Sequence, residues 1–141
     1  MQLQVKKWVV FFLLLLGVRV IGWADTPAAS LTFQALVAAD GVQHVSIVGG
    51  NFFFTPNHVV VKVGVPVELT LVREEGLIPH AFVIHAPQAG IDVDLSLSGS
   101  PKRIQFTPLA KGRYPFYCKN RLLFFKSHRE DGMEGVLEVV E

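Results

Sequence analysis

From residue 25 onward, the chain alternates short apolar runs with turn residues, and this pattern constrains the fold more than any other feature. Val67, Leu69 and Leu71 alternate with Glu68 and Thr70, which is the two-residue period of a half-buried strand. Gly, Pro or Ser bounds each run, and no stretch has a helical period of useful length. Several short strands of this kind predict an all-β fold, an antiparallel sandwich or barrel.

The length of 141 residues suits a single domain with one well-buried core. Asp40 and Gly41 separate two apolar runs and predict a tight two-residue hairpin turn. We assign residues 25–42 to an N-terminal extension that carries the first hairpin strand, and residues 43–141 to the domain. Residues 25–34 are expected to form a disordered lead-in.

The first 24 residues have the three-part layout of a secretory signal peptide. Two lysines precede an apolar run, and small residues stand before a cleavage position after Ala24. The alternative is an uncleaved membrane anchor. The apolar stretch Trp8–Trp23 has 16 residues and contains Arg19, whereas a spanning helix needs about 20 apolar residues. In both cases the domain is exported, to the periplasm or another extracytoplasmic space.

Cleavage changes the charge of the remaining domain. Residues 1–24 hold three bases and no acid, so their removal leaves ten bases against twelve acids. No basic stripe interleaved with aromatic residues is present in the sequence. A mildly acidic domain without such a stripe is not expected to bind nucleic acid.

The single cysteine, Cys118, raises the question of its role. Exported domains usually pair their cysteines in disulfides, so a lone one is an intermolecular link, an inert core thiol or a metal ligand. His128 and Met133 follow it closely, and His80 opens a strand directly after a proline. Two imidazoles, a thiolate and a weak axial thioether suit copper. We therefore predict one copper ion bound by His80, Cys118, His128 and Met133.

Other residues compete for these roles. His85 lies on the same extended run as His80, and we expect it on the same face; it is an ordinary surface histidine or one that supports the ligands, with a role as reserve candidate for the second imidazole in place of His128 as the alternative. Glu74 and Glu75 lie in the turn ahead of His80, and an oxygen ligand from there would make a harder and less favoured copper site. Met133 can also pack in the core, as methionines usually do. The remaining histidines, His44 and His58, are assigned structural roles.

Residues 119–132 form a loop between two predicted strands and contain an unusual apolar run, Leu122–Phe125. A purely solvated loop would not carry four large apolar residues together. The commoner explanation is that they cover the core as a short helical turn. The alternative is a docking patch on the surface.

A set of motifs gives the chain a resemblance to a known family. "FTPNHVVVKVGVPVELTL" is followed by "PHAFVI", then by "GRYPFYC", by a His-x-x-x-x-Met-x-Gly pattern and by a closing "GVLEVV". In this order, over about residues 43–141, they resemble the cupredoxin family, with plastocyanin and the periplasmic cupredoxins of metal-handling systems as the nearest types. The resemblance implies a Greek-key β-sandwich with a copper site of the type 1 kind, and one-electron transfer as the role. Its implied ligands are again His80, Cys118, His128 and Met133.

The chain departs from the family pattern in two respects. Nine residues separate Cys118 from His128, whereas the familiar small blue proteins have only a few. A longer loop can still close, because loop-closure entropy grows slowly with length. The single cysteine excludes the dinuclear copper centre of oxidase subunits, which bridges its metals with two thiolates.

These observations predict an exported one-electron carrier that is not an enzyme, since every ligand position is filled and no nucleophile–base pair is suggested. Its expected partners are redox proteins, including those of a membrane respiratory chain. Membrane association is expected only if the N-terminal segment stays uncleaved. One alternative is a copper-handling module, a store, sensor or delivery protein without redox cycling. Another is a metal-free cupredoxin-like subunit of a membrane complex.

Overall fold

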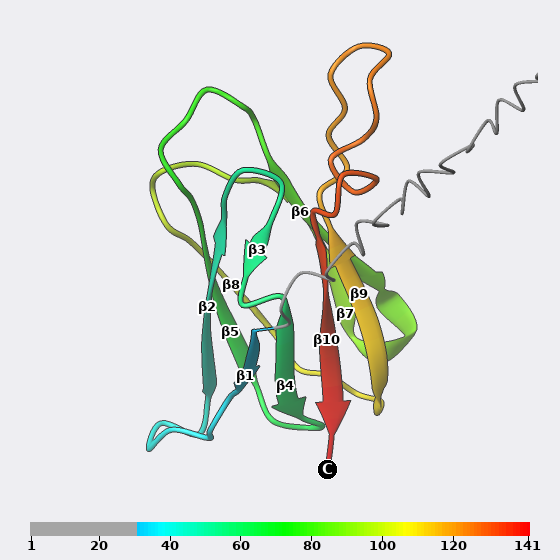
Figure 1. The fold of residues 1–141 in the computed structure, drawn as a ribbon. Coiled ribbons are helices and arrows are strands. Elements are labelled where there is room, and N and C mark those ends of the chain that lie inside the picture. The colour runs from blue at the N-terminus through cyan, green and yellow to red at the C-terminus, as the bar shows by residue number, and fades with distance from the viewer. Residues whose placement is uncertain (1–30) are drawn as a thin grey trace, which may run out of the picture.

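A computed structural model of the chain describes residues 31–141, so the predicted signal peptide lies outside the described residues. Within them, no helix is long and apolar enough to cross a bilayer. Figure 1 shows two layers of strands with the long loop after residue 118 projecting beyond one end. The elements are β1 (Thr32–Gln34), β2 (Gln43–Gly49), β3 (Phe54–Thr55), β4 (His58–Lys62), β5 (Val67–Arg73), β6 (Ala81–Ala86), η1 (Pro87–Ala89), β7 (Ile91–Ser96), β8 (Lys102–Phe106), β9 (Gly112–Tyr117) and β10 (Glu134–Val140).

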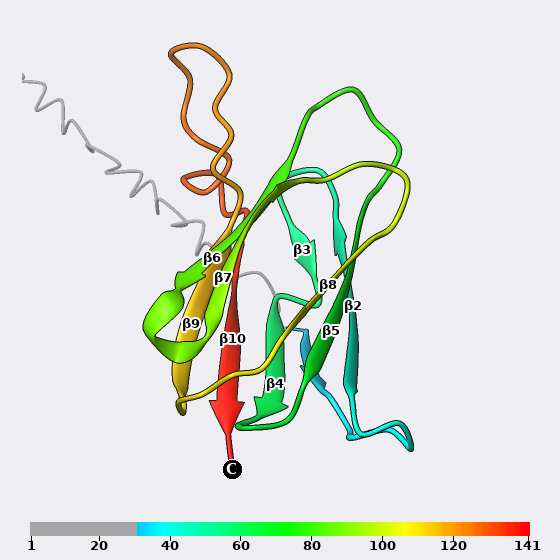
Figure 2. The same ribbon diagram turned by 180° about the vertical axis from the view of Figure 1, so that it is seen from behind.

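The strands form a six-stranded sheet in the order β1-β4-β10-β9-β6-β7 and a four-stranded sheet in the order β3-β2-β5-β8. The predicted all-β sandwich is confirmed. The expectation of antiparallel pairing throughout is wrong, because β1 with β4, β4 with β10, and β2 with β5 run parallel. The chain changes sheet between β2 and β4 and again before β5 (Figure 2), so neighbours within a sheet are often distant in sequence.

The predicted alternation of apolar and polar residues along the strands determines which side chains form the core. Val67, Leu69 and Leu71 of β5 are buried and face the interior between the sheets. Phe54, Phe82 and Phe116 meet there with ring centroids 5.0 to 5.7 Å apart. Such aromatic contacts add about 0.5–1.5 kcal/mol per pair beyond the burial of apolar area. Phe82 and Phe116 each lie two residues from a candidate ligand, on the same face of the strand, so the core directly supports the candidate site.

Of the hairpin predicted at Asp40 and Gly41, the turn is confirmed and the pairing of the two flanking strands is wrong. Gly41 has a φ of 80°, and its N–H donates to the carbonyl of Ala38. Beyond the turn a single bridge joins Val37 to Gln43, and the two flanking strands join different sheets. The disordered lead-in predicted for residues 25–34 is also wrong in its last part, since Thr32–Gln34 pair with β4. The boundary between residues 25–42 and 43–141 stays a prediction.

Candidate metal centre

Three strand ends meet at one end of the sandwich and carry three of the four candidate ligands. His80 directly precedes β6, Cys118 directly follows β9, and Met133 directly precedes β10. β9 lies antiparallel to both β6 and β10, with Tyr117 opposite Val83 and Glu134. Antiparallel neighbours bring the end of one strand to the start of the next. The sheet therefore brings these residues together, although they are far apart in the sequence.

The loop of residues 119–132 brings in His128. The N–H of His128 donates to the carbonyl of Asn120 at 2.9 Å, and the N–H of Met133 donates to the carbonyl of His128 at 2.8 Å. Glu130 accepts hydrogen bonds from the backbone N–H and the hydroxyl of Ser127, both at 2.7 Å. These bonds lower the pKa of the Glu130 carboxyl. The nine intervening residues thus form an ordered turn that holds His128 against the strand ends.

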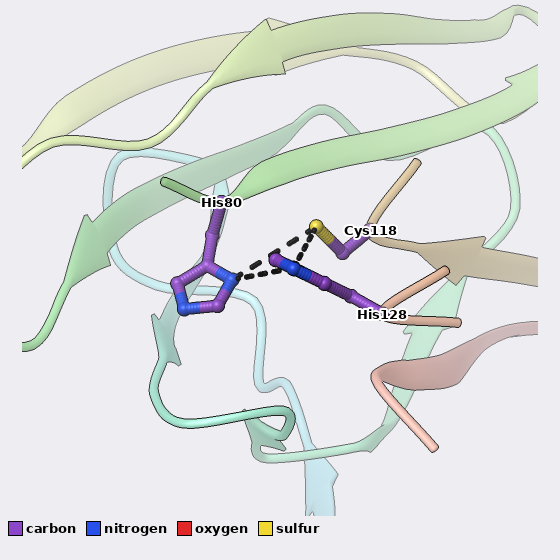
Figure 3. A group of neighbouring side chains, drawn as sticks. All are labelled: His80, Cys118 and His128. Carbon is purple, nitrogen blue, oxygen red and sulfur yellow. Dashed lines mark hydrogen bonds between the residues drawn. The ribbon is translucent and has the colours of Figure 1, made fainter. Parts of the chain in front are cut away.

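The donor atoms of His80, Cys118 and His128 converge (Figure 3). The Nδ1 atoms of the two rings are 3.1 Å apart, and the sulfur lies 3.5 Å from Nδ1 of His128 and 4.0 Å from Nδ1 of His80. Donors about 2.0–2.3 Å from a shared ion are themselves separated by roughly 3.3–3.8 Å. The three separations lie within about 0.2 Å of this range, so the triangle of donor atoms is close to the size that one bound metal ion requires.

The three donor residues are almost completely removed from water, since Cys118 is 0% exposed and both histidines are 4% exposed. The backbone N–H of Ala81 donates to the sulfur of Cys118 at 3.3 Å. This bond fixes the direction of the sulfur, and a metal ion binds the thiolate form of cysteine. The sulfur is thus directed toward the two rings and is not sealed among aliphatic groups.

Both imidazoles are kept neutral at physiological pH. The pKa of His80 falls from its ordinary value of 6.5 to about 4, chiefly because burial disfavours the charged ring, with further effects of His128 and Arg73. Burial also lowers the pKa of His128, against the opposing charge of Asp131. A neutral ring keeps a lone pair free for a metal ion. The pair therefore resists protons while remaining able to bind a metal.

Met133 is fully buried and directly precedes β10, at the same end of the sandwich as these donors. Its carbonyl accepts a hydrogen bond from the N–H of Cys118 at 3.0 Å, so the backbone connects it to the cysteine and to His128. A Cβ at Gly49 would lie 3.4 Å from the terminal methyl group of Met133 and 2.6 Å from Leu97. The absence of a side chain at Gly49 thus makes room for Leu97, while Met133 lies at contact distance from the same position. Sequence reasoning missed this glycine.

Phe52 is a second residue that sequence reasoning missed. Its ring lies edge-on to both imidazoles, with centroids 4.8 Å from His128 and 6.2 Å from His80. Its backbone has a φ of 63°, a conformation that costs a non-glycine residue about 1–3 kcal/mol. The neighbouring Gly50 and Asn51 are turn formers and are the only sequence signal for this bend. The strained residue restricts the orientation of both rings.

The loop of residues 74–79, which precedes His80, depends on Arg73. The guanidinium donates to the carbonyls of Gly76 and Ile78 at 2.5 and 3.0 Å. Its Nε is buried without a hydrogen-bond partner among the described residues. One side chain thus folds the loop back beside His80 and brings a positive charge near that ring.

Replacing Arg73 with methionine is expected to loosen this loop and to lower the free energy of unfolding by about 1–2 kcal/mol, because charge-assisted hydrogen bonds to two carbonyls are lost. Amide hydrogen exchange of residues 74–78 in the metal-free domain measures the effect. Arg103→Met removes an exposed arginine from β8 and serves as the control. Unchanged exchange in the Arg73 variant would show that the loop holds its shape without this side chain.

Comparison with known proteins decides the family. No curated protein matches this chain. The family model described as "Cupredoxin-like domain" matches residues 15–137. The chain belongs to the cupredoxin-like family. In this fold two buried imidazoles, a thiol and the neighbouring Met133 fit a type 1 site for one copper ion.

Solved structures share the fold of this cupredoxin. The metal-binding domain of the Cu(I)-exporting P-type ATPase CopA of Streptococcus pneumoniae D39, solved with Cu(I), is 23% identical with a TM-score of 0.58, covering 80% of this chain and 99% of that one. Reduced auracyanin of Roseiflexus castenholzii is 22% identical with a TM-score of 0.53, covering 70% and 97%. The periplasmic domain of cytochrome oxidase subunit II (CoxB) of Bradyrhizobium japonicum is 16% identical with a TM-score of 0.53, covering 70% and 83%.

The structure separates the remaining histidines of the cupredoxin from the cluster. His85 follows His80 by five residues, an odd number, and so lies on the opposite face of β6, where it is exposed and bonded to Asp92 at 2.8 Å. His44 contacts two carboxylates, and His58 contacts Thr32 and Glu138. Neither Glu74 nor Glu75 belongs to the cluster.

The interpretation of Leu122–Phe125 as core cover is wrong. These four side chains are 56 to 85% exposed, and the residues around them form turns without a helix. Leu122 and Phe125 line one side of a hollow of about 570 Å³, and Phe52, Leu77 and His128 line other parts of it. The apolar surface therefore surrounds the edge of the site at which His128 lies.

Proposed function

We propose that this cupredoxin binds one copper ion through Nδ1 of His80, Nδ1 of His128 and the sulfur of Cys118, with the Met133 sulfur as a weak axial ligand. The observation that carries the proposal is the buried triangle of two neutral imidazole nitrogens and one thiol sulfur. Soft sulfur and borderline nitrogen donors in this proportion suit copper in both oxidation states.

We further propose that the protein carries single electrons. Copper, when bound, supplies a one-electron couple. The chain supplies rigidity, since three of the four proposed ligands, His80, Cys118 and Met133, lie next to strand ends. Phe52 also contacts both imidazole rings. A site that moves little between two charge states exchanges an electron with little reorganisation. All donors are buried, which leaves no open position for a substrate and supports a carrier over an enzyme.

The route for the electron is the edge of His128. This ring lines the apolar hollow together with Phe52, Leu77, Ile78 and Phe125. A redox partner that seats here comes close to the ring without a covalent link, and apolar contacts allow it to leave again. The proposed partners are redox proteins, including those of a membrane respiratory chain. The exported location is supported by the sequence of residues 1–24.

Copper(II) added to the domain of residues 25–141 tests the proposal. The described strands and the core lie within this segment, so it holds the complete sandwich. We expect an intense visible absorption, narrow copper hyperfine splitting in electron paramagnetic resonance, and a reversible one-electron wave in voltammetry. Tight binding of copper(I) without a reversible wave would instead favour copper handling. No effect of copper on thermal stability would favour a metal-free domain.

A further inference from the structure

The loop after β9 carries an apolar tip, defined as Leu122–Phe125, and electron transfer at the hollow explains only Leu122 and Phe125, which line it. Leu123 and Phe124 are 75 and 85% exposed, and neither lines the hollow. Among residues 31–141, Phe124 stacks only on its neighbour Phe125, with centroids 5.0 Å apart. Figures 1 and 2 show the loop projecting beyond both sheets. Consecutive exposed apolar side chains of this size on a projecting loop indicate an interaction surface.

Two bases, Arg121 and Lys126, directly flank the apolar tip in the sequence. Residues 119–131 contain four bases and two acids. Lys119 pairs with Asp94, Arg121 with Glu130 and Arg129 with Glu134, so acids balance the charges of these three bases. Lys126, directly after the tip, forms no ion pair among the described residues. Apolar side chains flanked by cations match the boundary between anionic headgroups and acyl chains.

The direction of the chain agrees with a membrane at this end. β1 runs parallel to β10, which begins at the metal site, so the chain enters β1 from the site side. Eight residue steps separate Trp23, the end of the apolar segment, from Leu31, and these span at most about 28 Å. An uncleaved segment could therefore share one bilayer with the apolar tip.

We propose that Leu123 and Phe124 of the apolar tip insert into the surface of an anionic lipid bilayer and direct the metal-site end of the domain toward the membrane. A projecting run of apolar side chains needs no complementary cavity in a fluid bilayer, whereas a protein partner would have to provide one. Insertion of Leu123 and Phe124 leaves the hollow beside His128 to a redox partner at the same membrane surface. The proposal concerns the metal-free domain equally and does not rest on copper binding.

A tryptophan placed in the tip tests this proposal directly. Both tryptophans of the chain, Trp8 and Trp23, precede residue 25. The Phe124→Trp variant of the metal-free domain of residues 25–141 therefore contains a single tryptophan, at position 124. With vesicles of phosphatidylcholine and phosphatidylglycerol, we expect a blue shift of its emission and quenching by brominated acyl chains. Leu109→Trp is the matched control, because Leu109 is 68% exposed in the turn before β9, at the opposite end.

Partitioning of the same domain gives a second measurement. We expect Leu123→Ser with Phe124→Ser to weaken binding to these vesicles about tenfold or more, since two inserted apolar side chains are lost. Unchanged emission of the Phe124→Trp domain, or equal shifts at positions 124 and 109, would overturn the proposal. A blue shift that appears without vesicles and grows with protein concentration would also overturn it, in favour of a second copy of the chain. Equal binding to vesicles of phosphatidylcholine alone would show that anionic headgroups do not contribute and would overturn that part of the proposal.

Discussion

The Cys118→Ser domain is expected to lose completely the intense visible absorption that copper(II) gives in the parent domain. The band requires transfer of charge from a thiolate to the metal, and a serine hydroxyl is a hard donor that stays protonated near neutral pH. Serine is close to cysteine in size, so the buried pocket beside His80 and His128 keeps its shape. A titration with copper(II), followed by absorbance in the visible range, measures the loss.

Met133→Leu is the matched control for this prediction. Leucine fills a similar buried volume, and the axial sulfur is the weakest of the four proposed ligands. The visible band should therefore remain, while the reduction potential shifts because the thioether no longer favours the reduced ion. A visible band of parental intensity in the serine variant would refute Cys118 as a ligand. Loss of the band in a folded leucine variant would show that Met133 is more than a weak axial donor.

The strands could be predicted from the sequence because buried and exposed side chains alternate along a strand with a two-residue period. Val67, Leu69 and Leu71 alternate in the sequence and are buried in β5. The positions of His80 and Cys118 beside turn residues predicted that they lie at strand ends. What the alternation does not encode is which strands become neighbours. The three parallel pairings arise from crossovers between sheets and were missed for that reason.

The loops resisted prediction because their contacts are made by tertiary packing. Phe52 adopts a left-handed backbone conformation beside the imidazoles, which local propensity disfavours for an aromatic residue. Gly49 has importance only because Met133 and Leu97 pack against it. Leu122–Phe125 show the same limit, since apolar composition alone does not distinguish a core cover from an exposed tip. The alternative that placed His85 in the site was wrong because His85 follows His80 by five residues, an odd number, which puts the two side chains on opposite faces of the strand.

The metal-free domain is expected to lose stability as the pH falls from about 6.5 to about 4. In this window the ring of His80 in the unfolded chain takes up a proton, whereas the folded ring, with a pKa of about 4, does not. The unfolded state therefore binds more protons, and stability rises with pH. The pKa of His128 is lowered as well and acts in the same direction. The loss amounts to about 2–4 kcal/mol for His80 alone.

Urea unfolding of the metal-free domain at pH 7 and at about pH 5 measures the part of this loss that develops above pH 5, about 2 kcal/mol, in a range where most carboxyl groups remain ionised in both states. His44 acts in the opposite direction, because Asp40 and Glu68 raise its pKa and its stabilising effect fades as the pH rises. That ring is exposed, so its effect is the smaller one. His80→Gln should flatten the pH dependence. An equally steep dependence in the His80 variant would mean that proton uptake elsewhere limits the stability of the sandwich at low pH, and that the buried ring pair does not.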